Sequence, residues 1–369
     1  MTPRTLTWRE AAAWRARRHW LDERRPEGAG GAVGAVAVAS AVAGLHAQVM
    51  SSAELSVWAR AEGRPDVGGA LWERRTLVKT WAMRGTLHLL PTSEYRTFQA
   101  ALGRYRHYRT PGWLRGFGLT ADELDHILSA VPHALRGRLL TREELAAAVS
   151  PKVATSWGSL LKPSSFRGEL CFGPNLGQKV RFTHPETWLE LGPAADPDEA
   201  AREMTRRYVS AYGPATRLDY AHWWSGLSPA QAGRLIAALG EEVSEVAVEG
   251  VPHWMPSGDD TPVGTLRSVR LLPAFDPYVI AASPHATHLL PAPAAELRGR
   301  IYRPQGWLSP VVVVDGLMEG VWRSDRKGAR LVVTIELFRD LPAWARRAAA
   351  VEAERLAAFQ GGTLDLRFA

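Results

Sequence analysis

Apolar residues recur with a helical period over much of this chain of 369 residues, and short extended runs interrupt that period. The spacing predicts a helix over 7–25. A Gly- and Ala-rich stretch at 27–36 leads into a second helix, which Gly44 or the residues after it end. A third helix is expected over 53–60, and the alternating stretch 81–90 predicts a strand. Three helices followed by a strand is the order of a winged helix-turn-helix unit.

The same order returns in the middle of the chain. Thr120 and Thr141 each stand three residues before a glutamate, which is the capping-box signature of a helix start. A third helix is expected over 155–168, bent or ended by Pro163. Two apolar runs that flank residues 173–177 then predict a hairpin. These elements predict a second winged-helix unit.

A third repeat follows, with three helices and then a strand that ends in a turn. The helices are expected over 198–213, 215–224 and 228–239, and the strand over 243–248.

From about residue 262 the pattern changes to short extended runs. These are expected at 267–272, 279–282, 311–314, 317–322 and 330–338. Asp315 and Gly316 stand between two apolar runs and are a two-residue hairpin signal. We interpret this region as a small β-barrel or curved sheet, with a late helix over 342–359.

Together the patterns predict an α+β fold in which tandem winged helix-turn-helix units precede a C-terminal β-barrel-like unit. The expected units span 1–115, 116–195, 196–261 and 262–369.

Composition narrows the class of protein. Hydrophobic residues make up 46% of the chain and charged residues 22%, which is typical of a globular protein. The single cysteine, Cys171, excludes a disulfide framework. The first twenty residues lack the apolar core of a signal peptide, and the apolar stretch 29–45 is too short and weak to span a bilayer. We therefore expect a soluble cytoplasmic protein with no membrane partner.

The formal net charge is +7, and arginine supplies most of the positive charge. A basic protein favours nucleic acid as a partner, because its cations displace the counterions of the phosphate backbone. A high-GC genome that encodes arginine and alanine freely explains the same composition. Charge alone leaves both explanations open.

The tripeptide His46-Ala47-Gln48 is the first candidate for chemistry. If the backbone is extended there, His46 and Gln48 project to the same side, whereas on a straight helix they would not. An imidazole and a carboxamide side by side could hold and polarise one water molecule. The alternative is a buried pair whose polar atoms are satisfied by the backbone.

A second candidate lies in the predicted strand 81–90. There Arg84, Thr86 and His88 would share one face. They would either line a nucleic-acid cleft, with Arg84 at a phosphate and Thr86 or His88 at the nucleic acid or a water, or make structural hydrogen bonds within the first unit.

The segments 46–48, 81–88 and 272–278 together resemble the AlkZ/YcaQ-like DNA glycosylases, a winged-helix family of bacteria. AlkZ-like members have a Gln-x-Gln motif where this chain has His46 and Gln48, and the YcaQ-like branch has Gln-x-Asp. The second residue matches the AlkZ-like branch, and the first departs from both. This His-x-Gln variant leaves the water-activating role in place and puts the identity of the substrate in doubt.

The resemblance covers most of the chain and implies a C-shaped arrangement around a channel for duplex DNA. It implies a monofunctional glycosylase that hydrolyses the N-glycosidic bond of alkylated purines, with His46 and Gln48 as catalytic residues. Bulky N7-alkylguanine adducts of a genotoxic natural product are the expected substrate. Base excision repair and antibiotic self-resistance are then the expected context, in a monomer associated with the nucleoid.

Other residues are expected to contact DNA. Lys179 and Arg181 in the predicted hairpin are placed for the phosphate backbone. Arg303, Gln305 and Trp307 stand in a segment typical of an exposed loop, where they would meet DNA or the adduct.

The sequence lacks the motifs of several common classes of enzyme. The chain has no phosphate-binding loop, no zinc-protease motif and no nucleophile elbow, so no cofactor or metal is expected. The rival hypothesis is a non-catalytic winged-helix regulator, which explains the charge and the repeats but gives no role to His46 and Gln48.

Overall fold

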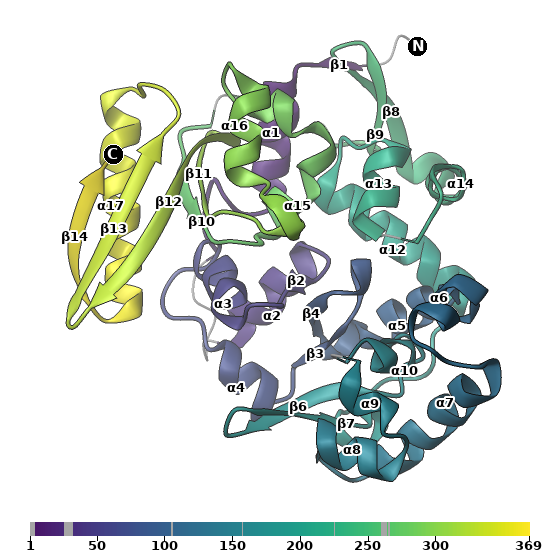
Figure 1. The fold of residues 1–369 in the computed structure, drawn as a ribbon. Helices are drawn as coiled ribbons and strands as arrows, with labels where there is room; N and C mark the ends of the chain where they lie inside the picture. Colours follow the sequence, from purple (N-terminus) through teal and green to yellow (C-terminus); the bar gives the residue numbers. More distant parts are fainter. Residues whose placement is uncertain are drawn as a thin grey trace.

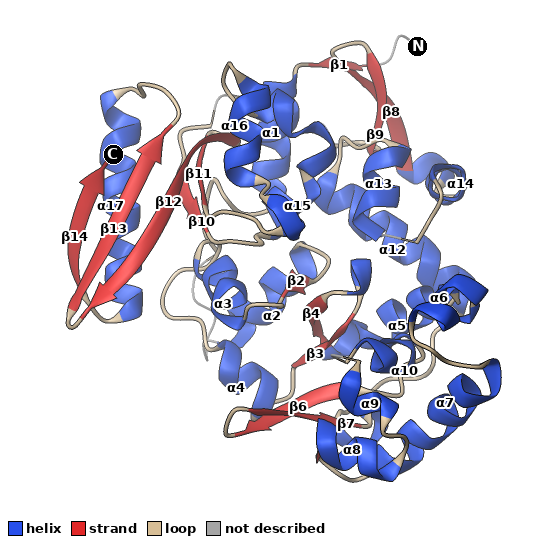
Figure 2. Cartoon of the chain, viewed as in Figure 1, coloured by secondary structure: helices blue, strands red, loops and turns tan. Residues whose placement is uncertain are grey.

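The computed structural model describes residues 4–25, 32–104, 106–156, 158–224, 226–259, 264 and 266–369. Much of the Gly- and Ala-rich stretch at 27–36 and the expected boundary between 261 and 262 lie outside these residues. Helices and four small sheets make up the described part of the chain (Figure 2). No helix in these ranges is long and apolar enough to cross a membrane.

The first sheet has three strands in the order β2-β4-β3 and lies near the middle of the molecule (Figure 1). The single strand predicted over 81–90 is wrong, because a tight turn at Met83–Gly85 separates two antiparallel strands. The elements of this segment are α2 (Ala32–Ala41), β2 (Leu45–His46), α3 (Met50–Trp58), α4 (Val67–Trp72), β3 (Leu77–Trp81) and β4 (Leu87–Pro91).

The second three-stranded sheet, β5-β7-β6, lies with its helices at one end of the molecule (Figure 1). Both predicted capping boxes are confirmed, since Thr120 and Thr141 each accept from the backbone of a glutamate three residues later. The elements are α5 (Tyr95–Gly103), α6 (Pro111–Gly116), α7 (Ala121–Leu135), β5 (Leu140–Thr141), α8 (Arg142–Ala148), α9 (Lys152–Thr155), α10 (Lys162–Phe166), β6 (Cys171–Leu176), β7 (Lys179–Thr183) and α11 (Pro185–Trp188).

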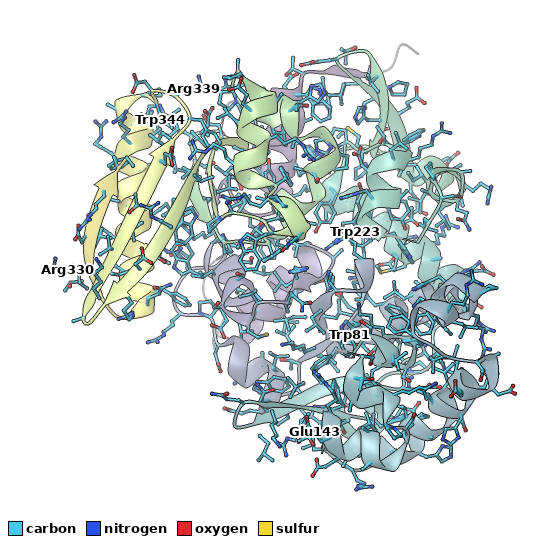
Figure 3. The ribbon with its side chains drawn as sticks, viewed as in Figure 1. Trp81, Glu143, Trp223, Arg330, Arg339 and Trp344 are labelled. Atoms are coloured by element: carbon cyan, nitrogen blue, oxygen red, sulfur yellow. The ribbon has the colours of Figure 1, made fainter. Side chains whose placement is uncertain are left out.

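Trp81 joins the first two sheets. From the end of β3 its ring packs against Phe172 and Phe182 of the second sheet (Figure 3). Only 7% of Trp81 is exposed, so it belongs to the core.

The third sheet pairs strands that lie far apart in the sequence. Strand β1 (Arg4–Leu6) runs parallel to β8, and β8 and β9 form a hairpin. Ala215 makes a single bridge to Trp254 on β9. The other elements are α12 (Pro197–Tyr212), α13 (Arg217–Trp224), α14 (Pro229–Ala237), β8 (Val243–Val248) and β9 (Val251–Pro256).

The C-terminal sheet has five strands in the order β10-β11-β12-β13-β14 and does not close into a barrel. Helix α17 contacts this sheet at β10 and β14. The elements are β10 (Val269–Leu272), α15 (Pro277–Ala281), α16 (Ala294–Ile301), β11 (Val311–Val314), β12 (Leu317–Lys327), β13 (Arg330–Leu337), α17 (Ala343–Gln360) and β14 (Thr363–Phe368).

The strand predicted over 279–282 is wrong, because these residues belong to or follow the short helix α15. Asp276 accepts from the backbone N–H of Tyr278 and caps the helix, and Pro277 supplies its first residue.

The two ends of the chain share one core. Helix α1 (Trp8–Arg18) buries Trp14 in the same apolar cluster as Val311 of the sheet and Leu356 of α17. Figure 1 shows α1 behind α16 and beside β10 and β11. The N-terminal helix therefore fixes the C-terminal region against the rest of the molecule.

Candidate active site

The short strand β2 aims His46 and Gln48 in one direction. His46 pairs with His88 of β4, and the N–H of Ala47 donates to the carbonyl of Leu87 at 2.7 Å. The backbone is therefore extended, and the side chain of Ala47 is fully buried in the core. His46 and Gln48 project to the other side, where both line one cavity.

Gly44 makes this geometry possible. Its φ of +103° lets the chain reverse between α2 and β2. A Cβ at this position would lie 2.9 Å from Cδ2 of Leu90 and 3.1 Å from Cε of Met83. A larger residue would therefore strain the backbone here and press on the side chains of Leu90 and Met83.

The cavity beside His46, called the site cavity here, has a volume of about 560 Å³. It lies where the first sheet, helix α13 and the region 275–308 meet. Seven of the ten residues expected to act at the site line it: His46, Gln48, Arg84, Thr86, Arg303, Gln305 and Trp307. The structure thus brings together residues that are up to 261 positions apart in the sequence.

His46 is buried, with 6% of its surface exposed. Its ring stacks on Phe275 at a centroid distance of 5.1 Å and meets the ring of His88 edge-on at 5.6 Å. Its Nδ1 atom is buried and has no hydrogen-bond partner among the described residues. Burial, and to a lesser extent the charge of Arg84, lower the pKa of His46 to about 3. The ring is therefore neutral near pH 7 and can accept a hydrogen bond.

Arg84 and Thr86 reach the cavity from a turn, not from a strand face. Arg84 and Gly85 both have left-handed backbones, with φ of 57° and 61°. The Arg84 guanidinium donates to the carbonyl of Trp223 at 3.1 Å, and the Thr86 hydroxyl donates to the carbonyl of Met83. Burial lowers the pKa of Arg84 to about 10, which leaves it charged near pH 7.

His88 does not line the site cavity, and its expected contact with the nucleic acid or a water stays a prediction. Only 2% of it is exposed, and its Nδ1 lies 3.0 Å from the carbonyl oxygen of Thr86. Its place on β4, opposite His46, makes it a packing partner of that ring.

Lys179 and Arg181 lie on β7 in the second sheet and do not line the site cavity. Lys179 is exposed, and Arg181 donates from Nε to the carbonyl of Pro174. Their expected contact with the DNA backbone stays a prediction.

The predicted loop residues Arg303, Gln305 and Trp307 are all exposed and form one rim of the cavity. Trp307 packs edge-on against Phe275 at 5.0 Å and leaves 54% of its surface exposed. A row of rings therefore runs from buried His88 through His46 and Phe275 to exposed Trp307.

Comparison with known proteins shows which family the chain belongs to. Residues 39–359 match the model of the family described as DNA glycosylase AlkZ-like. The chain belongs to the AlkZ-like DNA glycosylase family. It is 35% identical over 334 residues to an interstrand DNA cross-link repair glycosylase of Streptomyces sahachiroi, an alignment that covers 86% of this chain and 87% of the relative.

The solved structure of the DNA glycosylase AlkZ from Streptomyces sahachiroi matches with a TM-score of 0.85 and 34% identity. The match covers 99% of this chain and 100% of that one. The protein is therefore a DNA glycosylase, an enzyme that cleaves N-glycosyl bonds, and it has the mixed α+β fold of AlkZ.

Sequence reasoning missed two residues that shape this glycosylase's site. Phe275, with a left-handed φ of 60°, stacks on His46, and His222 lines the cavity from α13. Phe275 lies inside the segment 272–278, which resembles the family, so that resemblance could have indicated a residue near the site. Nothing in the sequence around His222 marks it.

The loop that carries Phe275 is anchored by a buried ion pair. Arg60 donates two hydrogen bonds of 2.7 Å to the two carboxylate oxygens of Asp276, and neither side chain is exposed. Asp276 is thus inaccessible to a substrate and organises its turn.

The site cavity of the glycosylase is built without carboxylates. Among the described residues that line it, none is Asp, Glu or Lys. No cluster of three or more His, Cys, Asp or Glu side chains that could hold a metal ion occurs in the described part of the chain.

Proposed function

We propose that this glycosylase hydrolyses the N-glycosidic bond of alkylated purines in duplex DNA, with bulky N7-alkylguanine adducts of a genotoxic natural product as substrates. The observation that supports this most strongly is that His46 and Gln48 lie together in a cavity whose described lining residues include no carboxylate. In the producing organism such an enzyme would act in base excision repair and self-resistance.

Alkylation at N7 puts a positive charge on guanine. The base then leaves as a neutral group and needs no proton from the enzyme. What the reaction needs is a water molecule held against the sugar as it becomes oxocarbenium-like. A neutral imidazole and a carboxamide both accept hydrogen bonds and suit that task. Since none of the described residues that line the cavity is a lysine, we expect hydrolysis without a Schiff base and without strand cleavage.

Exposed residues on the rim favour a bulky lesion. Gln48, His222, Arg303, Gln305 and Trp307 are all exposed, so the cavity is open to solvent. The relative from Streptomyces sahachiroi is named for interstrand cross-links, which are themselves bulky lesions. An open cavity accommodates a large adduct better than a snug pocket for an extruded base.

We infer that three segments act as winged helix-turn-helix units around the duplex. In each unit, three of the helices precede a hairpin. In the first, α2, α3 and α4 precede β3–β4. In the second, α7, α8 and α10 precede β6–β7, and in the third, α12, α13 and α14 precede β8–β9. Lys179 and Arg181 on β7 would contact the backbone. The protein would work as a cytoplasmic monomer on the nucleoid, with neither cofactor nor metal.

The test is base release from duplex DNA that carries one N7-alkylguanine, either methyl or bulky, by the wild type, His46→Ala and Gln48→Ala. We expect release by the wild type and a loss of at least about 100-fold in each variant, with binding to the duplex unchanged. Exposed Arg326 on β12, outside the cavity, gives the control Arg326→Ala, which should retain full release.

Failure of the wild type to release any alkylated base, with firm binding to DNA, would contradict the proposal. It would favour the non-catalytic winged-helix regulator. Release of the methyl adduct alone would keep the chemistry and remove bulky lesions as the substrate.

A further inference from the structure

A second cavity, called the aromatic cavity here, lies against the turn at residues 82–85. Its volume is about 390 Å³, within the range of small-ligand sites. Arg84 lines both this cavity and the site cavity, so the turn is a wall common to the two. The described residues that line it include neither Asp nor Glu.

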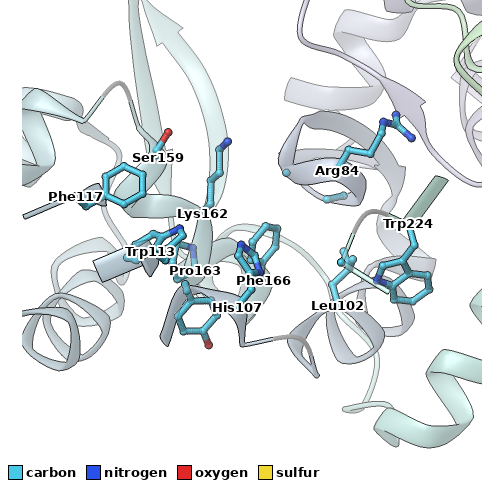
Figure 4. Close-up of a pocket in the computed structure, with 14 residues that line it drawn as sticks. Arg84, Leu102, His107, Trp113, Phe117, Ser159, Lys162, Pro163, Phe166 and Trp224 are labelled. Carbon is cyan, nitrogen blue, oxygen red and sulfur yellow. The ribbon is translucent and has the colours of Figure 1, made fainter. Parts of the chain in front are cut away.

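Aromatic rings from separate elements make up much of the wall (Figure 4). Trp113 and Phe117 come from the region of α6, Phe166 ends α10, and Trp224 ends α13. Trp113 and Phe117 contact each other at a centroid distance of 4.4 Å and are only half-buried, so part of each ring stays free. Such rings can stack on any base, because every base has a flat π-face.

Lys162 supplies a cation that lacks a counter-charge. It is half-buried at the start of α10 and has no hydrogen bond or ion pair to any described residue. Figure 4 shows its ammonium group pointing the same way as the Ser159 hydroxyl. Burial lowers its pKa, which indicates that the charge is poorly solvated there. A half-buried cation without a partner is costly, and an anionic ligand would remove that cost.

We propose that the aromatic cavity holds one nucleotide displaced from the duplex, with its base among Trp113, Phe117 and Phe166 and a phosphate on Lys162. The inference rests on duplex DNA being the partner, as proposed above. A flat ring system of the adduct would also fit the aromatic wall, but an uncharged ring gives the ammonium no partner. A nucleotide has both a base that can stack on the rings and a phosphate that can pair with the ammonium group.

The experiment uses the full chain and duplexes that contain no alkylated base, so its outcome does not depend on glycosylase activity. Affinity is compared between a fully paired duplex and one with a single unpaired nucleotide. We expect the wild type to prefer the unpaired nucleotide, and Lys162→Gln and Trp113→Leu each to lose about tenfold of that preference. Affinity for the paired duplex should stay within about threefold of the wild type.

Lys79 gives a matched control. It is also half-buried with a pKa lowered by burial and lies over the ring of Phe172, but it does not line the aromatic cavity. Lys79→Gln should therefore keep the preference. Thermal unfolding of all three variants shows whether each is folded.

A photo-crosslink adds a readout that does not depend on any variant. A 5-iodouracil at the unpaired position should attach to a peptide that contains Trp113, Phe117 or Phe166. The proposal is overturned if the wild type shows no preference, if both cavity variants keep it, or if the crosslink falls elsewhere.

Discussion

At the scale of single residues, the ring of His46 is a weak base in a hydrophobic setting. Burial is the larger cause of its low pKa, and Phe275 and His88 supply that burial. A ring with a pKa near 3 takes a proton reluctantly but accepts a hydrogen bond readily. In our proposal His46 therefore holds the water and fixes its direction, as a carboxamide would.

This role predicts the effect of His46→Gln, which restores the Gln-x-Gln pattern of AlkZ-like relatives. We expect His46→Gln to retain base release within about tenfold of the wild type, because an amide oxygen replaces a neutral nitrogen as acceptor. Removal of the acceptor in His46→Ala should cost about 100-fold or more. Single-turnover release on one N7-alkylguanine duplex measures both. Equal losses in the two variants would show that the imidazole itself is required.

The same pKa predicts the pH profile. Since the neutral ring is the active form and its pKa lies near 3, its fraction stays constant from about pH 5 to about pH 8. Enzyme-dependent release, corrected for spontaneous loss of the base, should therefore show no acid limb near pH 6.5. An inflection there that disappears in His46→Gln would indicate an ordinary histidine acting as general base.

What the sequence could predict at this scale depends on separation along the chain. His46 and Gln48 are two residues apart on an extended segment, so their common direction followed from local geometry once the strand formed. Phe275 and His222 reach the cavity only through the tertiary fold. An aromatic or a histidine alone gives no local signal of such a contact.

At the scale of elements, the loop before α15 holds the site in place. Phe275 packs against His46 with a left-handed backbone, and the neighbouring Asp276 is locked by Arg60. The geometry of the His46 ring thus depends on an ion pair that does not line the cavity.

Asp276→Asn tests this dependence. It leaves the buried guanidinium of Arg60 without its counter-charge, which costs about 3–5 kcal/mol of unfolding free energy. Base release by the folded variant should fall further than its DNA affinity, since Phe275 loses its anchor. Urea unfolding and release measure the two effects. The exposed pair of Arg346 and Asp340 gives the control, where Asp340→Asn should change stability by less than about 1 kcal/mol.

Element prediction failed where backbone chemistry outweighed the apolar pattern. The alternation over 81–90 is real, but Arg84 and Gly85 adopt left-handed backbones that turn the chain back. The apolar run over 279–282 suggested a strand, whereas Asp276 followed by Pro277 is a helix-start signal. That second signal was present in the sequence and was outweighed by β-branched residues.

At the scale of the whole molecule, buried neutral histidines link the fold to pH. The pKa values of His19, His46, His88 and His285 are all lowered, chiefly by burial. In the unfolded chain a histidine binds a proton below about pH 6.5, whereas these four do not in the folded state. Their stabilising contribution is therefore complete above that pH and is lost as the pH falls.

We expect unfolding free energy to drop between pH 7 and pH 5. The pKa values of His46 and His285, about 3 and about 4, correspond to about 2 kcal/mol each at pH 5. Urea unfolding at the two pH values measures the difference. An unchanged urea midpoint would mean that these rings are protonated in the folded protein.

The helix starts after Thr120 and Thr141 were visible in the sequence, because a capping box is a local signal. Whether the C-terminal strands close into a barrel was not visible in the sequence. Closure depends on the twist of the sheet and on which strands pair. Those strands form an open sheet with β10 and β14 at its edges. The parallel pairing of β1 with β8 was also absent from the prediction, because Arg4–Leu6 is too short to show a pattern.

That pairing has a consequence for how the cell makes the protein. Leu6 leaves the ribosome about 240 residues before its partner Val248 is synthesised. At a rate of about 5 to about 20 residues per second, the N-terminal segment waits for about 12 to about 50 seconds with its β-edge unpaired. Helix α1 waits longer for part of its core, which includes Val311 and Leu356. During translation the chain therefore exposes the apolar face of this helix and a strand edge, as chaperone substrates do, and it completes its fold only after the last strands emerge.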